Sequence, residues 1–196
     1  MVSGDPRNLR MTYSDNQFRN KVVIYGNSPT IAGFTLGVRY AGIGGTRFSV
    51  TAGGNVNGDF VDTNDLAYIF PNLTQTLIDN PEVGQALKNY ITDYNNKVAE
   101  RNGGKNGFYG VWDVRVAKKI KFEKIGAFEL SVDIFNVANL LNKEWGVNKS
   151  YGNTALYRIT GFDQATKQFK YSLNTSGLEP LSGNPYQIQI GAKYSF

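Results

Sequence analysis

The side chains that could do chemistry in this chain are limited by two absences, since the sequence contains neither histidine nor cysteine. Histidine is the commonest general base and metal ligand, and cysteine is needed for disulfides, thiol nucleophiles and thiolate metal sites. The remaining candidates for acid–base work are Glu129 with Asp133 and Asp113 with Arg115. Each pair falls on a strand face where charge is expected anyway, so the sequence predicts no enzyme and no catalytic residue.

One loop has oxygen-bearing side chains at the spacing that binds a hard cation. Residues 55–65 read NVNGDFVDTND, and Asn57, Asp59, Asp62 and Asp65 would supply oxygen ligands to Ca²⁺. The loop starts with asparagine, has phenylalanine where glycine is usual, and is shorter than the usual loop of about twelve residues. The alternative is a surface loop of Asx turns, in which the same side chains bind the local backbone. We expect no other cofactor.

The strands that must position these side chains are clearest at the end of the chain. Residues 186–196 alternate apolar and polar without a break, and successive side chains of a strand point to opposite faces. The apolar set consists of Tyr186, Ile188, Ile190, Ala192, Tyr194 and Phe196, and the polar or small set of Gln187, Gln189, Gly191, Lys193 and Ser195. One face suits lipid or a core, and the other suits water.

The same alternation predicts four more strands, at about 126–136, 112–122, 33–50 and 18–25. In the third of these, Phe48 and Val50 resume, after the glycines at 42, 44 and 45, the parity of the residues before them. Lys118 interrupts the apolar face of the 112–122 strand. A lysine fits there if the site lies near an interface that its ammonium group can reach by extending along the surface.

Two short connections, at about 26–31 and 123–126, alternate along the chain with two long ones, at about 54–109 and 143–183. Short turns on one side and long loops on the other are typical of an outer-membrane β-barrel. The first long loop is predicted to contain one helix at about 81–100, with Asn80 as N-cap, Pro81 at the first position and glycines at the end. In the second loop, residues 156–159 and 169–172 are predicted to pair as a hairpin.

Composition agrees with a membrane strand protein. The 196 residues include 22 glycines and 12 each of tyrosine and phenylalanine, a mixture that favours strands and turns. No run of about 18 apolar residues exists, but a spanning strand needs only about 9–11. The N-terminal sequence MVSGDP is not a signal peptide, so we expect a processed protein or a fragment. The net charge of +5 has no long basic run, so we expect no nucleic-acid partner.

The predicted fold is therefore all-β, as an antiparallel up-and-down transmembrane barrel segment with about five long strands of a larger barrel. Residues 1–196 would be the C-terminal part of one barrel domain, and the helix would lie in a long extracellular loop. The polar side chains expected to line the lumen are Arg39, Arg115, Lys119, Glu129, Asp133, Gln187, Gln189 and Lys193. Aromatic side chains, among them Trp112, Trp145 and Tyr194, would form the girdles at the membrane interfaces.

Several motifs resemble a known family. The terminal strand ending in Phe196 resembles the assembly signal of outer-membrane barrels. The segment GGNVNGDFVDTNDLAYIFPN (53–72) resembles a loop of TonB-dependent receptors of the Oar-like or SusC-like kind, as do AERNGG (99–104) and the strand VWDVRV (111–116) that follows it. DIFNVANLLNKEWG (133–146) is similar to the family's penultimate strand and its exit. The motifs stand in the family's order from about residue 18 onward.

This resemblance implies a barrel of about 22 strands with an N-terminal plug, and uptake of a bulky substrate driven by the TonB complex. The implied partners are the remaining barrel and plug, the TonB complex acting through that plug, outer-membrane lipid and a surface lipoprotein. The implied location is the bacterial outer membrane. This chain lacks a plug and a TonB box, so only the barrel wall and outer loops carry over.

The alternative function is a soluble, secreted β-sandwich that binds a ligand such as a carbohydrate. Trp145 and the tyrosine-rich loops would then form the binding site. A chain of this kind would bury its apolar strand faces in its own core and would need no lipid.

Overall fold

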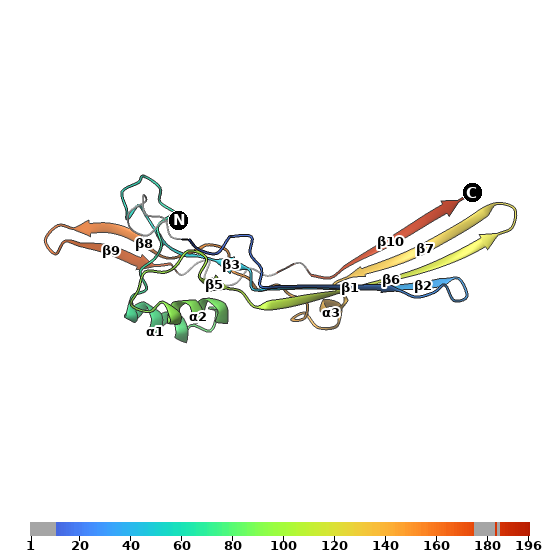
Figure 1. The fold of residues 1–196 in the computed structure, drawn as a ribbon, viewed down its shortest axis with the longest axis horizontal. Helices are drawn as coiled ribbons and strands as arrows, with labels where there is room; N and C mark the ends of the chain where they lie inside the picture. Colours follow the sequence, from blue (N-terminus) through green and yellow to red (C-terminus); the bar gives the residue numbers. More distant parts are fainter. Residues whose placement is uncertain (1–10, 175–182, 184) are drawn as a thin grey trace. The chain divides into compact units, whose positions relative to one another are not determined.

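The computed structural model describes residues 11–174, 183 and 185–196, and its elements are mostly strands (Figure 1). The chain forms two compact units. We call Asn20–Gly44, Phe108–Asn148 and Ser182–Phe196 the sheet unit. We call Met1–Arg19, Gly45–Gly107 and Lys149–Leu181 the loop unit, because it contains most of the two predicted long loops.

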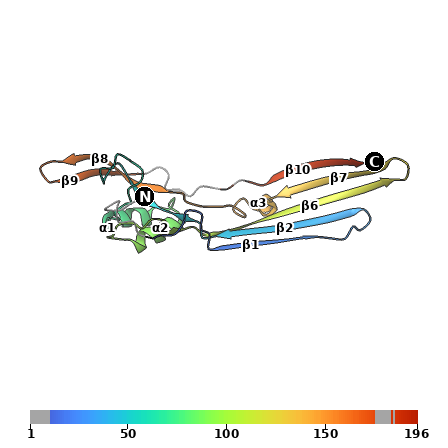
Figure 2. The same cartoon turned by 45° about the horizontal axis from the view of Figure 1, so that its top comes forward.

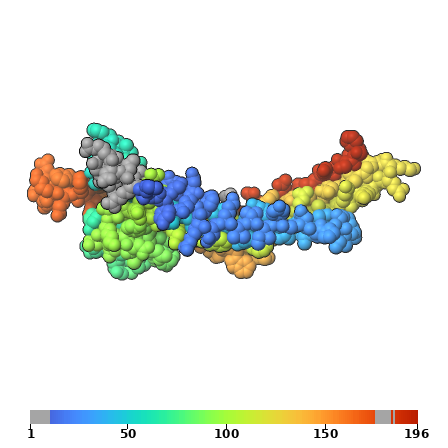
Figure 3. Space-filling view, in the orientation of Figure 1, coloured from blue at the N-terminus to red at the C-terminus, as the bar shows by residue number. Residues whose placement is uncertain are grey.

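The sheet unit is one antiparallel sheet with the strand order β1-β2-β6-β7-β10, as Figure 2 shows from bottom to top. Its strands are β1 (Asn20–Asn27), β2 (Phe34–Gly44), β6 (Phe108–Phe122), β7 (Gly126–Phe135) and β10 (Gln187–Ser195). In Figure 3 the blue atoms of the N-terminal strands and the red atoms of β10 lie on opposite edges of this unit. The five predicted strands are thus confirmed as one antiparallel sheet, although the strand predicted at 33–50 ends at Gly44.

In two neighbouring rows, the pairing register places apolar residues opposite apolar residues, and polar or small residues opposite one another. Leu36 of β2 lies opposite Val116 of β6, which in turn lies opposite Val132 of β7, and Val132 lies opposite Ile190 of β10. The next row along contains Gly37, Arg115, Asp133 and Gln189. Directly paired residues of neighbouring strands share a face, so these rows alternate between an apolar face and a polar face. The polar face also contains Val23 and Tyr25 of β1, and Val111 and Phe135 toward the end where β6 begins.

The two short connections link β1 to β2 and β6 to β7, at residues 28–33 and 123–125, close to the predicted positions. They lie at the same end of the sheet as the C-terminus (Figure 2). Gly33 adopts a left-handed conformation with φ of 82°, and a side chain there would strike the carbonyl of Lys119. A third helix, α3 (Val137–Leu141), follows β7 directly.

The loop unit has its own core. Here β4 (Val50–Gly53) pairs in parallel with β8 (Thr154–Asp163), β8 pairs with β9 (Gln168–Leu173), and β3 (Arg47–Phe48) pairs with β5 (Gly104–Lys105). Helices α1 (Pro71–Asp79) and α2 (Gln85–Asp93) pack beside them (Figure 1). The largest fully buried apolar side chains are Phe48, Ile69, Leu77, Leu87, Ile91, Leu156 and Val50.

The predicted helix at 81–100 is wrong in its bounds and number. Pro71 starts a first helix that the sequence reasoning missed, and Pro81 lies in the turn between α1 and α2. The Asn80 side chain accepts a hydrogen bond from the backbone N–H of Glu82 at 2.9 Å, which is an Asx turn rather than a cap. The second helix ends at Asp93, and the chain turns shortly afterwards at Asn96, where φ is 60°.

The predicted strand that continues to Phe48 and Val50 is also wrong. Gly45, with φ of 73°, redirects the chain after β2, and both apolar side chains are buried in the loop unit's core. The hairpin prediction is confirmed, with Ile159 opposite Tyr171 in the β8–β9 pair. No helix among the described residues is long and apolar enough to cross a membrane.

Candidate functional site

The apolar face of the sheet unit is uncovered by the rest of that unit. Leu36 is 46% exposed and Ile190 is 77% exposed, whereas Leu156 in the loop unit is fully buried. The predicted terminal-strand residues behave alike: Tyr186, Ile188, Ile190, Tyr194 and Phe196 are all exposed. Other large exposed side chains on this face are Val22, Ile24, Phe34, Val38, Trp112, Val116, Ile120, Phe122, Leu130 and Val132.

Aromatic side chains lie toward both ends of this face. Tyr40 and Trp112 are cross-strand partners whose ring centroids are 4.7 Å apart, near the end where β6 begins. At the short-turn end, the Tyr194 hydroxyl donates a hydrogen bond to the backbone carbonyl of Ile125. Aromatic rings thus lie at both ends of the apolar face, with aliphatic side chains between them.

The structure accounts for Lys118, the single charge that interrupts the apolar face. Its ammonium group lies 4.0 Å from the centroid of the Phe34 ring, and it donates a hydrogen bond of 2.6 Å to the carbonyl of Ala32. Ala32 is in the short β1–β2 turn. The side chain therefore covers apolar surface with its stem and places its charge at the end of the sheet.

Ion pairs cross the strands on the polar face. Arg39 Nη1 lies 2.7 Å from Asp113 Oδ2, and Arg115 Nη1 binds both carboxylate oxygens of Asp133, at 3.0 and 2.9 Å. Arg115 Nη2 also lies 3.6 Å from Glu129 Oε1. The sequence had grouped Asp113 with Arg115, but the salt bridges join residues of neighbouring strands. The carboxylates of Asp113, Glu129 and Asp133 each form an ion pair with an arginine.

All eight predicted lumen residues lie on this one face. The register places Lys119 and Lys193 on either side of Glu129, and places Gln189 opposite Asp133. Gln187 belongs to the same face of β10. The structure thus brings the predicted set together. That this set lines a lumen remains a prediction.

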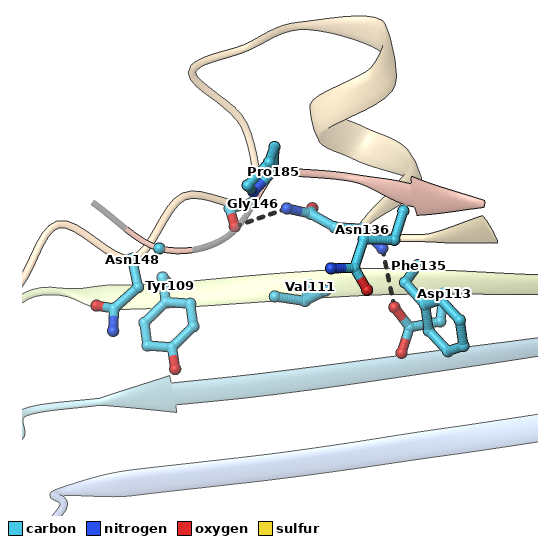
Figure 4. A pocket seen from close by; sticks show the side chains of 10 residues that line it. Tyr109, Val111, Asp113, Phe135, Asn136, Gly146, Asn148 and Pro185 are labelled. Carbon is cyan, nitrogen blue, oxygen red and sulfur yellow. Dashed lines mark hydrogen bonds between the residues drawn. The ribbon is translucent and has the colours of Figure 1, made fainter. Parts of the chain in front are cut away.

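A pocket of about 460 Å³ lies on the polar face, near the end where β6 begins (Figure 4). In it, Asp113 Oδ1 accepts a hydrogen bond of 3.0 Å from the backbone N–H of Asn136. Asn136 has left-handed φ and ψ of 54° and 51°, and its Nδ2 donates to the Gly146 carbonyl at 3.1 Å. Tyr109 and Phe135 add ring surface. The asparagine-rich exit from β7 thus shapes this pocket, a role that the sequence did not reveal.

Three of the predicted calcium residues, Asn57, Asp59 and Asp65, accept hydrogen bonds within their own loop. Asp65 is buried, and its Oδ2 accepts hydrogen bonds from the backbone N–H groups of Val56 and Asn57, at 2.6 and 3.2 Å. Asn57 Oδ1 accepts from the backbone N–H of Asp59 at 2.9 Å. Among the described residues, no three or more acidic side chains are grouped so that they could hold a metal ion, and Asp62 is therefore not part of such a group. This geometry favours the Asx-turn alternative, and a calcium site in this loop stays a prediction.

The same loop explains the charge state of Asp59. A hydrogen bond of 2.6 Å from Asn64 Nδ2, and then one of 2.9 Å from the backbone N–H of Val61, lower the pKa of the Asp59 carboxyl. Its oxygens are therefore used to stabilise the turn.

The two parts of the alternative binding site belong to different units. Trp145 is exposed in the sheet unit and, with Phe108 and Trp112, lines a cavity of about 420 Å³. The clustered tyrosines, Tyr68, Tyr157 and Tyr171, belong to the loop unit. Sequence reasoning had placed them in one site.

Comparison of this chain with family models, with curated proteins and with solved structures gave no match. The function is therefore inferred from the faces, edges and cavities of the two units. The two-faced sheet is the feature that departs most from an ordinary soluble protein, because large apolar side chains in such proteins seldom form an extended exposed surface.

Proposed function

We propose that the sheet unit is part of the wall of a transmembrane β-barrel in the bacterial outer membrane. The observation that carries this proposal is the separation of apolar and polar rows across β2, β6, β7 and β10 toward the short-turn end of a single-layer sheet, although β1 also places Val23 and Tyr25 on the polar face. Apolar side chains would face lipid, and the ion-paired rows would face the lumen. The mechanism needs no catalytic residue, because the wall encloses a path and holds charge along it.

The dimensions of the sheet support this proposal. Ten residue steps separate Trp112 from Phe122 on β6. At about 3.4 Å per residue this is roughly 34 Å of strand, and a tilt of about 40° reduces it to a height of roughly 26 Å. The apolar band of an outer-membrane barrel is about 25 Å tall. The separation of Trp112 and Phe122 along the barrel axis would thus match the height of that apolar band.

The edges of the sheet indicate that the wall continues. Within the described residues β1 pairs with β2 alone and β10 pairs with β7 alone. An unpaired backbone group in hydrocarbon costs several kcal/mol, and single-chain bacterial barrels have at least about eight strands. Both edges therefore need partner strands, from another chain or from the rest of the same receptor.

The resemblance to TonB-dependent receptors of the Oar-like or SusC-like kind supports a more specific proposal. The chain would form the C-terminal wall of a transporter for a bulky substrate, with Phe196 and the short turns on the periplasmic side. The loop unit would be extracellular, where it meets substrate and a surface lipoprotein. The polar face would contact the plug, through which the TonB complex acts.

Detergent dependence is the first test of this proposal. The purified full chain is expected to precipitate in plain buffer and to keep its strand content in detergent or lipid, as measured by circular dichroism and light scattering. A folded, monodisperse chain in plain buffer would overturn the membrane proposal and favour the soluble β-sandwich.

Labelling neighbours on β10 tests which face meets lipid. The chain has no cysteine, so Ile190→Cys and Gln189→Cys each give one labelling site. A spin label at position 190 should be relaxed by oxygen dissolved in the bilayer, and one at 189 by a water-soluble nickel complex. The reverse pattern, or equal water access at both sites, would contradict the assigned faces.

A further inference from the structure

Four aromatic rings form a continuous cluster on the loop unit. Phe70 and Tyr171 are stacked, with centroids 5.0 Å apart and planes 6° from parallel. Tyr68 meets Phe70 edge-on at 4.9 Å, and Tyr157 lies 5.4 Å from Tyr171. The cluster joins the segment before α1 to the β8–β9 hairpin, shown in orange in Figure 1.

Hydrogen bonds hold two of the four rings, Tyr157 and Tyr68, in place. The buried Tyr157 hydroxyl accepts a hydrogen bond of 3.1 Å from the backbone N–H of Tyr68. The Tyr68 hydroxyl in turn donates to Asn96 Oδ1 at 2.8 Å. Rings fixed in this way lose little freedom when a ligand stacks on them, which favours binding.

The rings line a cavity of about 530 Å³, within the range of small-molecule sites. Val56, Ile159 and Phe169 supply the rest of its apolar lining. Tyr171 and Phe169 are both about half exposed, at 46% and 48%, so their rings are accessible from solvent.

One charge stands at this cavity. Lys167, in the β8–β9 turn, lines it together with the Gln168 amide, and no carboxylate is among the lining residues. The acid of the same hairpin, Asp163, pairs with Lys170 at 3.4 Å and accepts hydrogen bonds from the turn's backbone. Lys167 makes no ion pair with any described residue, so its charge is available to a ligand.

We propose that this cavity binds a small ligand with a flat, mostly apolar ring and one negative charge. The ring would stack on the Tyr171 face that Phe70 does not cover, and the anion would meet the Lys167 ammonium. A neutral polyol fits less well, because beyond Lys167 and Gln168 the polar groups are the tyrosine hydroxyls, and unpaired ligand hydroxyls would lose their water. This inference stands whether the sheet unit faces lipid or a soluble core.

Calorimetric titration of the full chain with 2-naphthoate and its neutral analogue 2-naphthamide tests the ligand class. Both titrations use one detergent, with detergent alone as the blank. The carboxylate is expected to bind saturably with a Kd between about 1 μM and 1 mM, at least tenfold more tightly than the amide. Equal affinity for the two compounds, or no saturable binding of naphthoate, would overturn the proposal.

Matched variants locate the site. Lys167→Gln is expected to weaken naphthoate about tenfold and to leave naphthamide unchanged, whereas Lys170→Gln, on the same hairpin but outside the cavity, should change neither. Tyr171→Leu should weaken the binding of both compounds. Because Tyr171 is about half exposed, this substitution should destabilise the fold less than Phe70→Leu. Circular dichroism verifies the fold of each variant. Equal loss in the Lys167 and Lys170 variants would place the anion elsewhere and refute the assignment.

Discussion

The two units treat apolar side chains in opposite ways. In the loop unit they meet one another, so Phe48, Ile91 and Leu156 have no exposed surface. In the sheet unit they lie in rows on one face and remain about half exposed. Both kinds of segment contain leucine, isoleucine and valine at their apolar positions. The difference shows that the apolar side chains of a strand favour removal from water, but do not determine whether protein or lipid covers them.

The largest expected effect compares two leucines. Leu156→Ala should destabilise the loop unit by about 2–5 kcal/mol, because it leaves a cavity in a packed core. Leu36→Ala, on the uncovered face, should cost much less, because detergent or lipid refills the space. Denaturant unfolding of the full chain in detergent, followed by near-UV circular dichroism, measures both. Equal losses would mean that Leu36 is also packed against protein.

A charge placed on either face of β10 gives the next largest difference. Ile190→Arg should reduce the free energy of folding into a bilayer by about 2–4 kcal/mol, because the guanidinium group would enter hydrocarbon. Gln189→Arg should have little effect, since its side chain lies on the polar face opposite Asp133. Folding yield into lipid vesicles, read by gel mobility, measures this difference. Tolerance of arginine at 190 together with loss at 189 would invert the two faces.

The pocket of the sheet unit tests whether this unit also contains tightly packed parts. Gly146 has φ of 64°, and a side chain there would collide with the Asn136 amide. Gly146→Ala should therefore cost about 1–3 kcal/mol and disturb the hydrogen bond between Asn136 and Asp113. Gly152→Ala is the matched control, because no atom lies within 4 Å of the position that its new methyl group would occupy. Thermal unfolding of the two variants should separate them clearly, and equal melting temperatures would contradict the tight packing at Gly146.

High pH should affect the loop unit selectively. Burial, and then the nearby Tyr94, raise the pKa of Tyr90, and burial with the hydrogen bond to Glu100 raises the pKa of Tyr94. The unfolded chain thus releases these protons first, so the stabilisation is complete below about pH 10 and is lost as pH rises above it. Unfolding at pH 8 and pH 11 measures the loss, and Tyr90→Phe should reduce it. An unchanged loss in that variant would assign the effect to other groups.

The smallest expected effect concerns the ion pairs of the polar face. Asp113→Asn removes the charge that Arg39 meets and should cost no more than about 1 kcal/mol, because the pair is partly exposed. The amide oxygen of the variant keeps an acceptor for the Asn136 backbone. Unfolding at low and high salt measures the change, which should shrink as salt rises. A much larger loss would indicate that this pair is excluded from water.

Sequence reasoning succeeded where the signal is local and periodic. The alternation through Ile188, Ile190 and Tyr194 predicted β10, and the same pattern predicted its four partner strands. The β8–β9 hairpin followed from two short runs on either side of a turn. The predicted polar set also shares one face, because a strand's period of two determines the side of the sheet on which each residue lies.

Sequence reasoning failed where distant segments decide the outcome. The parallel pairing of β4 with β8 joins residues about one hundred positions apart, and nothing within either segment specifies it. Helix α1 has no side-chain cap at Phe70, so its start left a weak signal apart from Pro71. The burial of Asp65 and its two backbone donors, Val56 and Asn57, also could not be read from the spacing of the loop.

The sequence by itself determined the two faces of the long strands, because side-chain direction in a strand depends only on residue order. It also determined that no histidine or cysteine chemistry is available. The tertiary structure decided which apolar residues are buried, since Phe48 continues the parity of β2 yet lies in the loop unit's core. It also assembled the aromatic cavity from Phe70 and Tyr171, two residues that stack only because separate segments are brought together when the core excludes water.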